Sequence, residues 1–245
     1  MRFFPVVSLA LIVTTASPVI AATEVAPKPY SMDGEFGFIL TTGNTDTTSI
    51  SAGLKGTQEL TEWSNEYTLE GLYKQDEVAG SKETTAQKLY LAGQGNYKLT
   101  NPNQRLFAFS SYEDDRFSSF QYQATLALGY NQQVLQDEKQ TFNYSVGPGY
   151  SFAKDQAGAD LNSVIVRAAL DYSYVLSDNA RITQTLSTEY GDDNTKSRSK
   201  TSVIAKLNNG ISMKVSLKLD HNSSVEGDAD NLDTETSVTL VYSFF

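Results

Sequence analysis

The chain has 245 residues, a formal net charge of −10 at pH 7 and no cysteine. Its length suits one large domain. Its acidic balance argues against binding to nucleic acid or to an anionic lipid surface, because both use clustered Lys and Arg. The 14 Tyr and 12 Phe beside a single Trp suit a sheet with one apolar face and one wetted face.

The first predicted element is an export signal at residues 1–22. Arg2 supplies a positive charge, FFPVVSLALIVTTA is a short apolar stretch, and SPVIAA offers small residues for cleavage after Ala21 or Ala22. The apolar stretch is too short, and too interrupted by Thr and Pro, for a membrane anchor. We therefore expect an exported chain with a short periplasmic segment at 23–33.

From residue 34 to residue 245 the apolar residues recur at every second position, which is the period of a β-strand with two different faces. In GISMKVSLKLDH, for example, apolar residues from Ile211 to Leu219 alternate with polar residues. In chain order the pattern predicts twelve strands, at 34–42, 48–60, 64–76, 84–98, 104–116, 120–133, 140–153, 161–176, 180–191, 198–209, 210–222 and 233–245.

The breaks between these strands mostly alternate between tight turns and longer polar loops. NPNQ, QDEK, SDNA and NNGI are tight, whereas AKDQAGAD, GDDNTKSRS and NSSVEGDADN are longer and charged. Short turns at one end and longer loops at the other, with an even number of long strands, are typical of outer-membrane barrels. A soluble β-sandwich or periplasmic barrel is the alternative, but soluble strands are usually shorter.

An open sheet in lipid would leave edge N–H and C=O groups unpaired, so the last strand must pair with the first. The predicted fold is an all-β, transmembrane, antiparallel up-and-down β-barrel of about twelve strands at 34–245. We expect it in the outer membrane of a Gram-negative cell.

Several stretches also resemble a known family when they are taken in order. They are TTGNTDTTSISAGLKG (41–56), SYEDDRF (111–117), ALGYN (127–131) and VGPGYSF (146–152). They resemble the YdiY-like family of outer-membrane proteins described as salt-induced, a domain of unknown function. The resemblance covers about 30–245 and implies an outer-membrane barrel without an established biochemical role. It supplies no catalytic residues, and it hints at a response to salt or osmotic conditions.

Candidates for catalysis or metal binding are few. His221 is the only histidine, with Asp220 and Ser223 nearby. Positions 220 and 221 of a strand face opposite ways, so we prefer a solvated turn over a Ser–His–carboxylate site. The acidic stretches GDADNLD (227–233) and GDDN (191–194) lack the ligand spacing of an EF-hand loop. Solvated loops, or loops that bind lipopolysaccharide-bridging cations, explain them. We predict no enzyme activity, cofactor or metal site.

The strand alternation also assigns charged side chains to a wetted lumen, opposite lipid-facing residues such as Phe36 and Leu240. Mixed charges there would either pair in a network that fills the lumen or set up a transverse field in a narrow aqueous channel. The candidate lumen residues are Glu66, Glu70, Lys74, Lys88, Arg167, Asp171, Arg181, Glu189, Lys200, Lys206, Lys214 and Lys218.

Two further stretches carry specific predictions. SYEDDRF puts Glu113, Asp115 and Arg116 at the outer end of the fifth strand, where they would form an ion pair that fixes a tight loop or face a constriction. At the C-terminus, Tyr242, Phe244 and Phe245 form the terminal aromatic pattern that the barrel resemblance links to the outer-membrane assembly machinery. Either Phe245 projects past the strand, or it is the recognised terminus.

These observations favour a narrow passive channel for small hydrophilic solutes or ions, with a link to salt or osmotic response. The alternatives are a non-conducting structural or envelope-stress barrel and, more weakly, a barrel-embedded enzyme that acts on lipid. The expected partners are outer-membrane lipid, lipopolysaccharide and the barrel assembly machinery, and no nucleic acid. The solute and the oligomeric state stay open.

Overall fold

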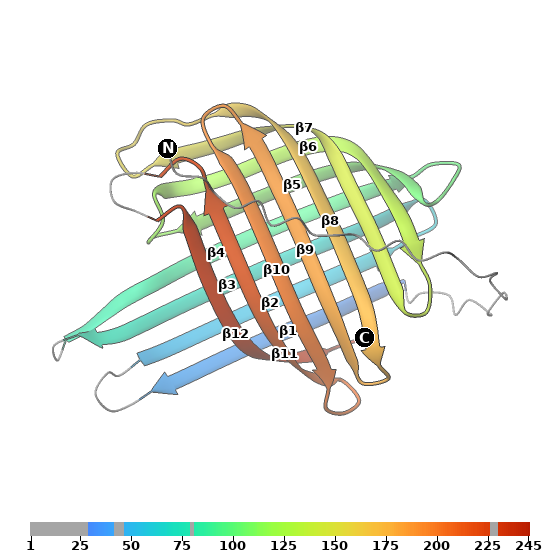
Figure 1. Ribbon diagram of the computed structural model, residues 1–245, viewed down its shortest axis with the longest axis horizontal. Helices are drawn as coiled ribbons and strands as arrows, with labels where there is room; N and C mark the ends of the chain where they lie inside the picture. Colours follow the sequence, from blue (N-terminus) through green and yellow to red (C-terminus); the bar gives the residue numbers. More distant parts are fainter. Residues whose placement is uncertain (1–28, 42–46, 79–80, 226–229) are drawn as a thin grey trace, which may run out of the picture.

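In a computed structural model, the protein forms a closed barrel of antiparallel strands (Figure 1). The structure describes residues 29–41, 47–78, 81–225 and 230–245. Their strands are β1 (Tyr30–Thr41), β2 (Thr47–Glu59), β3 (Trp63–Val78), β4 (Ser81–Lys98), β5 (Gln104–Asp115), β6 (Phe120–Gln136), β7 (Gln140–Asp155), β8 (Ser163–Ser177), β9 (Ala180–Gly191), β10 (Thr195–Lys206), β11 (Ile211–Asn222) and β12 (Leu232–Ser243).

Each strand pairs with its neighbours in the chain, and β12 pairs with β1 to close the ring. The predicted fold class, an antiparallel all-β barrel of twelve strands, is therefore confirmed. No helix among the residues that the structure describes is long and apolar enough to cross a membrane. The predicted signal peptide at 1–22 lies outside the described residues.

Most strand boundaries differ from the predicted ones by one to four residues, and two of the strand starts bear on the site. β1 begins at Tyr30, inside the periplasmic segment predicted at 23–33, because Tyr30 to Asp33 continue the ladder with β2. β10 begins at Thr195 rather than at residue 198, since Thr195 already pairs with Tyr190 of β9. The charged sequence TKSR has the composition of a loop, but here it forms the start of a strand.

The barrel has two different ends. The connections 60–62, 99–103, 137–139, 178–179 and 207–210 lie at the end where β1 begins and β12 finishes, which we call the turn end. Gly210 in the last of these turns has a φ of 103°, a conformation that glycine adopts without steric cost. The described connections 116–119, 156–162 and 192–194 lie at the opposite end, which we call the loop end.

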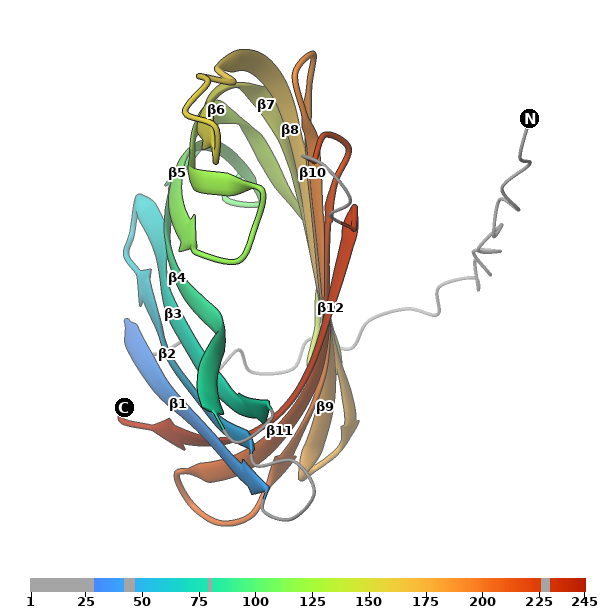
Figure 2. The ribbon, with the colours of Figure 1, turned by 90° about the vertical axis from the view of Figure 1, so that its left-hand side faces the viewer.

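The ring is flattened rather than circular. Figure 2 shows β1–β5 as one long wall and β8–β12 as the facing wall, with β6 and β7 closing one narrow end. Backbones approach closely at this narrow end. A Cβ built on Gly147 would collide with the carbonyl group of Leu128, and one on Gly129 would collide with that of Val146. The narrow end therefore requires glycine at both positions.

The closing seam between β1 and β12 is short. Four positions of β1, Asp33 to Phe36, pair with β12, whereas every other pair of neighbouring strands shares ten or more. Two more contacts extend it at the turn end: the Phe244 amide donates to the Met32 carbonyl at 2.8 Å, and Ser243 Oγ donates to Asp33 Oδ1 at 2.6 Å. Phe245 lies beyond the last of these contacts and is exposed.

The outer surface is apolar and the inside is largely polar, the reverse of a soluble protein. Exposed outward residues include Leu128, Val164 and Leu240, whereas the buried residues are mainly polar or charged. Aromatic pairs lie near both ends, such as Trp63 with Tyr97 at the turn end and Tyr112 with Tyr122 at the loop end. Such bands suit the two membrane–water interfaces of a barrel. The small inner apolar cluster, at the narrow end, is Phe107, Phe109 and Ala127.

Candidate functional site

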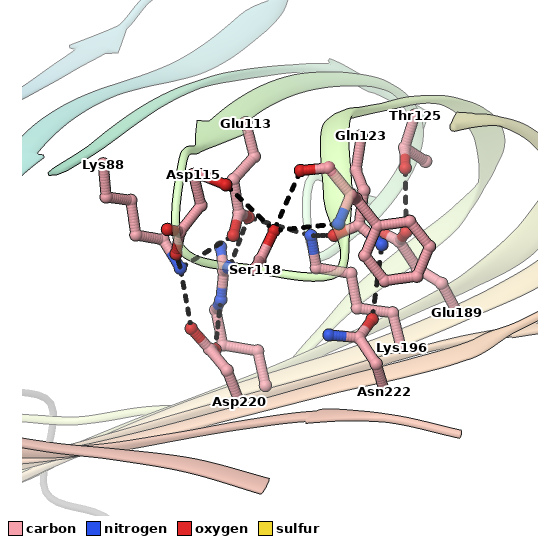
Figure 3. A network of polar contacts seen from close by, with 12 residues as sticks. Lys88, Glu113, Asp115, Ser118, Gln123, Thr125, Glu189, Lys196, Asp220 and Asn222 are labelled. Carbon is pink, nitrogen blue, oxygen red and sulfur yellow. Dashed lines mark hydrogen bonds and ion pairs between the residues drawn. The ribbon is translucent and has the colours of Figure 1, made fainter. Parts of the chain in front are cut away.

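The lumen is crossed near the loop end by an ion-pair network that we call the loop-end network, made of Lys88, Glu113, Lys196, Arg198 and Asp220. Glu113 is its centre, with Lys88 Nζ at 2.7 Å from Oε1, and Lys196 Nζ at 2.8 Å and Arg198 Nη2 at 2.5 Å from Oε2. Arg198 Nε also lies 2.7 Å from Asp220 Oδ1. Because β4 and β5 belong to one wall and β10 and β11 to the other, the network ties the two walls together (Figure 3).

Amide side chains extend this network toward the rim. Lys196 Nζ donates to Gln123 Oε1 at 2.7 Å, and Gln123 Nε2 donates to Asn222 Oδ1 at 3.3 Å. Ser118 Oγ in the β5–β6 connection donates to the Asp115 carbonyl at 3.0 Å (Figure 3). The rim is therefore held by side chains from strands far apart in the sequence.

The three predicted rim residues lie in two different environments. Glu113 and Asp115 both face inward, and Lys88 lies between them at 2.7 Å and 3.3 Å. Arg116 is exposed and donates to Gln87 Oε1 at 3.3 Å, so the ion pairs of Glu113 and Asp115 go to the lumen instead. Of the two alternatives drawn from the sequence, an ion pair that fixes a tight loop does not describe this arrangement.

A second group of charges lies deeper in the lumen, and we call it the constriction: Glu35, Glu70, Lys200 and Lys218. Lys200 Nζ is 2.7 Å from Glu70 Oε1, and Lys218 Nζ is 3.8 Å from Glu70 Oε2. Glu35 accepts a bond from Lys214 Nζ at 2.6 Å. These residues come from β1, β3, β10 and β11, which lie around the seam.

Two cavities meet at the constriction. The smaller, of about 60 Å³, lies on its loop side and is lined by residues such as Ser51, Lys88 and Glu235. The larger, of about 420 Å³, extends toward the turn end as far as Ser31 and Arg181, and we call it the main cavity. All four constriction residues line both cavities. The two cavities therefore adjoin at these four side chains.

Arg167 lines the main cavity in a different way from the other cations. It is 6% exposed, and its guanidinium carbon lies 3.7 Å from the centre of the Phe109 ring. Its Nε and Nη1 have no hydrogen-bond partner. Glu189 Oε1 is 3.7 Å from Nε, while Glu189 Oε2 accepts a bond from Thr125 Oγ1 at 2.7 Å.

The predicted lumen residues fall into distinct places. Eight line the main cavity: Glu66, Glu70, Arg167, Asp171, Arg181, Lys200, Lys214 and Lys218. Lys88 lines the smaller cavity, and Glu189 contacts Arg167. Lys74 lies near the loop end beside Asp76, and Lys206 is exposed at the turn end. That these residues line a conduction path stays a prediction.

The sequence reading missed Lys196, Arg198 and Tyr90. Lys196 and Arg198 belong to the loop-end network, and the Arg198 guanidinium lies 4.4 Å from the centre of the Tyr90 ring. A usable signal was present, because basic residues occupy positions 196, 198 and 200 with the strand period. This signal was missed because the predicted strand began at residue 198, which left Lys196 in a predicted loop.

In the described part of the chain, the candidate catalytic and metal-binding residues do not come together in a site. His221 is exposed, and Ser223 Oγ bonds to Asn194 Oδ1 and the Thr195 amide rather than to the imidazole. Within the described ranges, no three His, Asp or Glu side chains are grouped to hold a metal ion. Part of the acidic stretch 227–233 lies outside those ranges.

A closed antiparallel sheet with an apolar outer surface and a charged lumen defines an outer-membrane-type β-barrel. The chain belongs to the family described as "Protein of unknown function, DUF481", whose model matches residues 34–244. It is 26% identical over 220 residues to the uncharacterized protein YdiY of Escherichia coli (strain K12), across 89% of this chain and 84% of that protein. The resemblance seen in the sequence is thereby confirmed.

Solved structures show the same architecture. The COG4313 outer membrane channel from Pseudomonas putida F1 matches with a TM-score of 0.50 and 11% identity, across 90% of this chain and 97% of that one. The NanC porin matches with a TM-score of 0.52 and 10% identity, across 86% and 98%. At these identities the likeness concerns the fold alone.

Proposed function

We propose that the protein is exported by a cleaved signal peptide to the outer membrane of a Gram-negative bacterium and is a narrow passive channel for small hydrophilic solutes or ions. The observation that carries this proposal is the pair of lumen cavities, lined in part by charged side chains, that share the constriction residues. The family resemblance adds a proposed link to salt or osmotic response. This link concerns the conditions under which the protein is produced.

The chemistry of the constriction sets the expected selectivity. Glu35 and Glu70 lie with Lys200 and Lys218 where the two cavities adjoin, so both signs of charge line this part of the proposed route. Rings of one sign select ions of the other sign, whereas a mixed ring selects weakly. Mixed charge in a narrow passage therefore favours small solutes with little preference between cations and anions.

Single-channel recording in a planar bilayer tests the proposal. Protein that is folded, as judged by heat-modifiable gel mobility, is expected to give small stepwise currents. Replacing both Lys214 and Lys218 by Glu is expected to shift the reversal potential in a salt gradient toward cation selectivity. Lys139→Glu, at an exposed turn, is the matched control. Folded protein without steps would refute the channel.

A non-conducting structural barrel is the second candidate, and the loop-end network favours it. Ion pairs between facing walls would brace a flattened ring whether or not solutes pass. The same recordings separate the two candidates. The proposed partners are outer-membrane lipid and lipopolysaccharide around the wall, and the assembly machinery at the terminal aromatic strand. We propose no enzymatic role.

A further inference from the structure

We propose that the main cavity binds a small organic carboxylate through the guanidinium group of Arg167. The inference deepens the proposed function by naming a substrate class, and it rests on that function for the route by which the solute arrives. It begins from a side chain whose hydrogen-bonding capacity is not used within the barrel.

Arg167 is a buried cation without a full partner. Its Nε and Nη1 donate to no acceptor, and the 3.7 Å between Nε and Glu189 Oε1 is too long for a hydrogen bond. Buried donors that stay unpaired destabilise a protein, more so when they are charged. A side chain that reaches solvent avoids this cost, but Arg167 is 94% buried. The site therefore lacks an acceptor.

The nearest carboxylate is held in a position that does not supply it. Thr125 is buried and donates from Oγ1 to Glu189 Oε2 at 2.7 Å. This bond turns Glu189 toward β6 and leaves its other oxygen at the long distance from Arg167. By contrast, Lys200, Lys214 and Arg198 each have a carboxylate oxygen at 2.7 Å or less.

Phe109 fixes how the guanidinium is presented. The ring lies under the guanidinium plane at 3.7 Å, which is favourable for the cation and restricts its rotation. As the side chain lies, Nε and Nη1 have almost no accessible surface, so a ligand reaches the guanidinium edge only after the side chains around it shift. A carboxylate is planar and accepts two parallel N–H bonds, so its geometry matches a preorientated guanidinium.

The cavity around Arg167 has the size and charge for such a ligand. Its volume of about 420 Å³ lies within the range of about 300–1,000 Å³ typical of small-molecule sites. Seven cationic side chains and five carboxylates line it, although the chain as a whole carries a net charge of −10. Phe109, Ala92 and Ala169 add apolar surface for the body of the solute.

Calorimetry on the purified, folded barrel in detergent tests binding without requiring conduction. The probe is benzoate, with benzyl alcohol as an uncharged analogue and inorganic phosphate as a second anion. We expect saturable benzoate binding, and binding of benzyl alcohol and phosphate at least about tenfold weaker, because the charged planar bidentate contact is lost. Phosphate that binds as tightly as benzoate would overturn the carboxylate assignment.

Two variants locate the site. Arg167→Gln is expected to weaken benzoate binding at least about tenfold, whereas Arg105→Gln, in which the lost guanidinium lies at the turn end, leaves it unchanged. Thr125→Val keeps the arginine but frees Glu189 to pair with it, so benzoate binding should also weaken. Thr125→Val therefore tests the site even if Arg167→Gln does not fold. Equal benzoate affinity in wild type and both variants would refute the inference.

The two proposals fail differently. Benzoate binding by a barrel that gives no stepwise current would remove the channel and leave the carboxylate site. Stepwise current from a folded barrel that does not bind benzoate would remove the site and leave the channel. Benzoate that binds and also reduces the single-channel current would support both.

Discussion

Replacing Glu113 by Gln removes the central charge of the loop-end network with little change in shape. Glu113 is 7% exposed and contacts Lys88, Lys196 and Arg198. In the variant, Lys88 and Arg198 keep Asp220, but Lys196 retains only the amide of Gln123. Lys196 would then have no carboxylate partner, whereas Lys88 would keep Asp115 as well as Asp220.

The expected loss of stability follows from burial. Removing one partner of a buried ion pair costs about 3–5 kcal/mol, because the remaining charge stays desolvated. Since two of the three cations keep a carboxylate, we expect the lower end, about 3 kcal/mol of unfolding free energy. A suitable control is Asp160→Asn, because Asp160 and Lys154 form an exposed pair at 3.6 Å. Exposed pairs contribute about 0–1 kcal/mol.

Urea unfolding in detergent micelles measures both variants. The single Trp, Trp63, lies partly exposed on the outer face at the turn end, so its fluorescence reports loss of the barrel from a site distant from Glu113. Both substitutions remove one negative charge, so net charge does not distinguish them. If Glu113→Gln lost no more unfolding free energy than Asp160→Asn, the network would not be stabilising the barrel.

Three further outcomes are expected. Gly147→Ala should cost about 1–3 kcal/mol of unfolding free energy by overpacking the narrow end, whereas Gly71→Ala, with no atom closer than 4.0 Å to its new Cβ, should cost less. Backbone N–H donors in its turn hold the pKa of Asp137 below its usual value. The stabilising effect of Asp137 is therefore complete above its unfolded pKa of about 3.9 and disappears as the pH falls through the lower folded pKa. The difference in urea midpoint between wild type and Asp137→Ala should shrink accordingly, and a constant difference would contradict this. Deleting Phe245 should leave heat-modifiable barrel in the membrane fraction, because the last backbone bond belongs to the preceding residue; periplasmic accumulation would show that it is the recognised terminus.

The strand pattern predicted the architecture well because alternation is a local property. Residues such as Leu217 and Lys218 must face opposite sides of any strand, so twelve alternating segments already imply an apolar wall and a polar lumen. The alternation also assigned most of the cavity-lining charges. The start of β10 was missed because a polar segment such as TKSR looks like a loop until its pairing partner is known.

Pairing across the lumen could not be predicted in this way. Glu113 and Arg198 are 85 positions apart, and the period-two pattern says only that both point inward. Whether they meet depends on the flattening of the ring, whose narrow end has close backbone packing at Gly129 and Gly147. The unpaired state of Arg167 depends on a single hydrogen bond between Thr125 and Glu189. Such details arise from the closed three-dimensional arrangement and have no local signature.

The short seam has a mechanical consequence. A closed barrel is only as resistant to opening as its weakest strand pair, and here that pair is β1 and β12, which share four paired positions. Separating these strands breaks fewer ladder bonds than separating any other neighbours. Force or heat should therefore separate β1 from β12 first, while the other neighbouring strands stay paired in one open, twisted sheet.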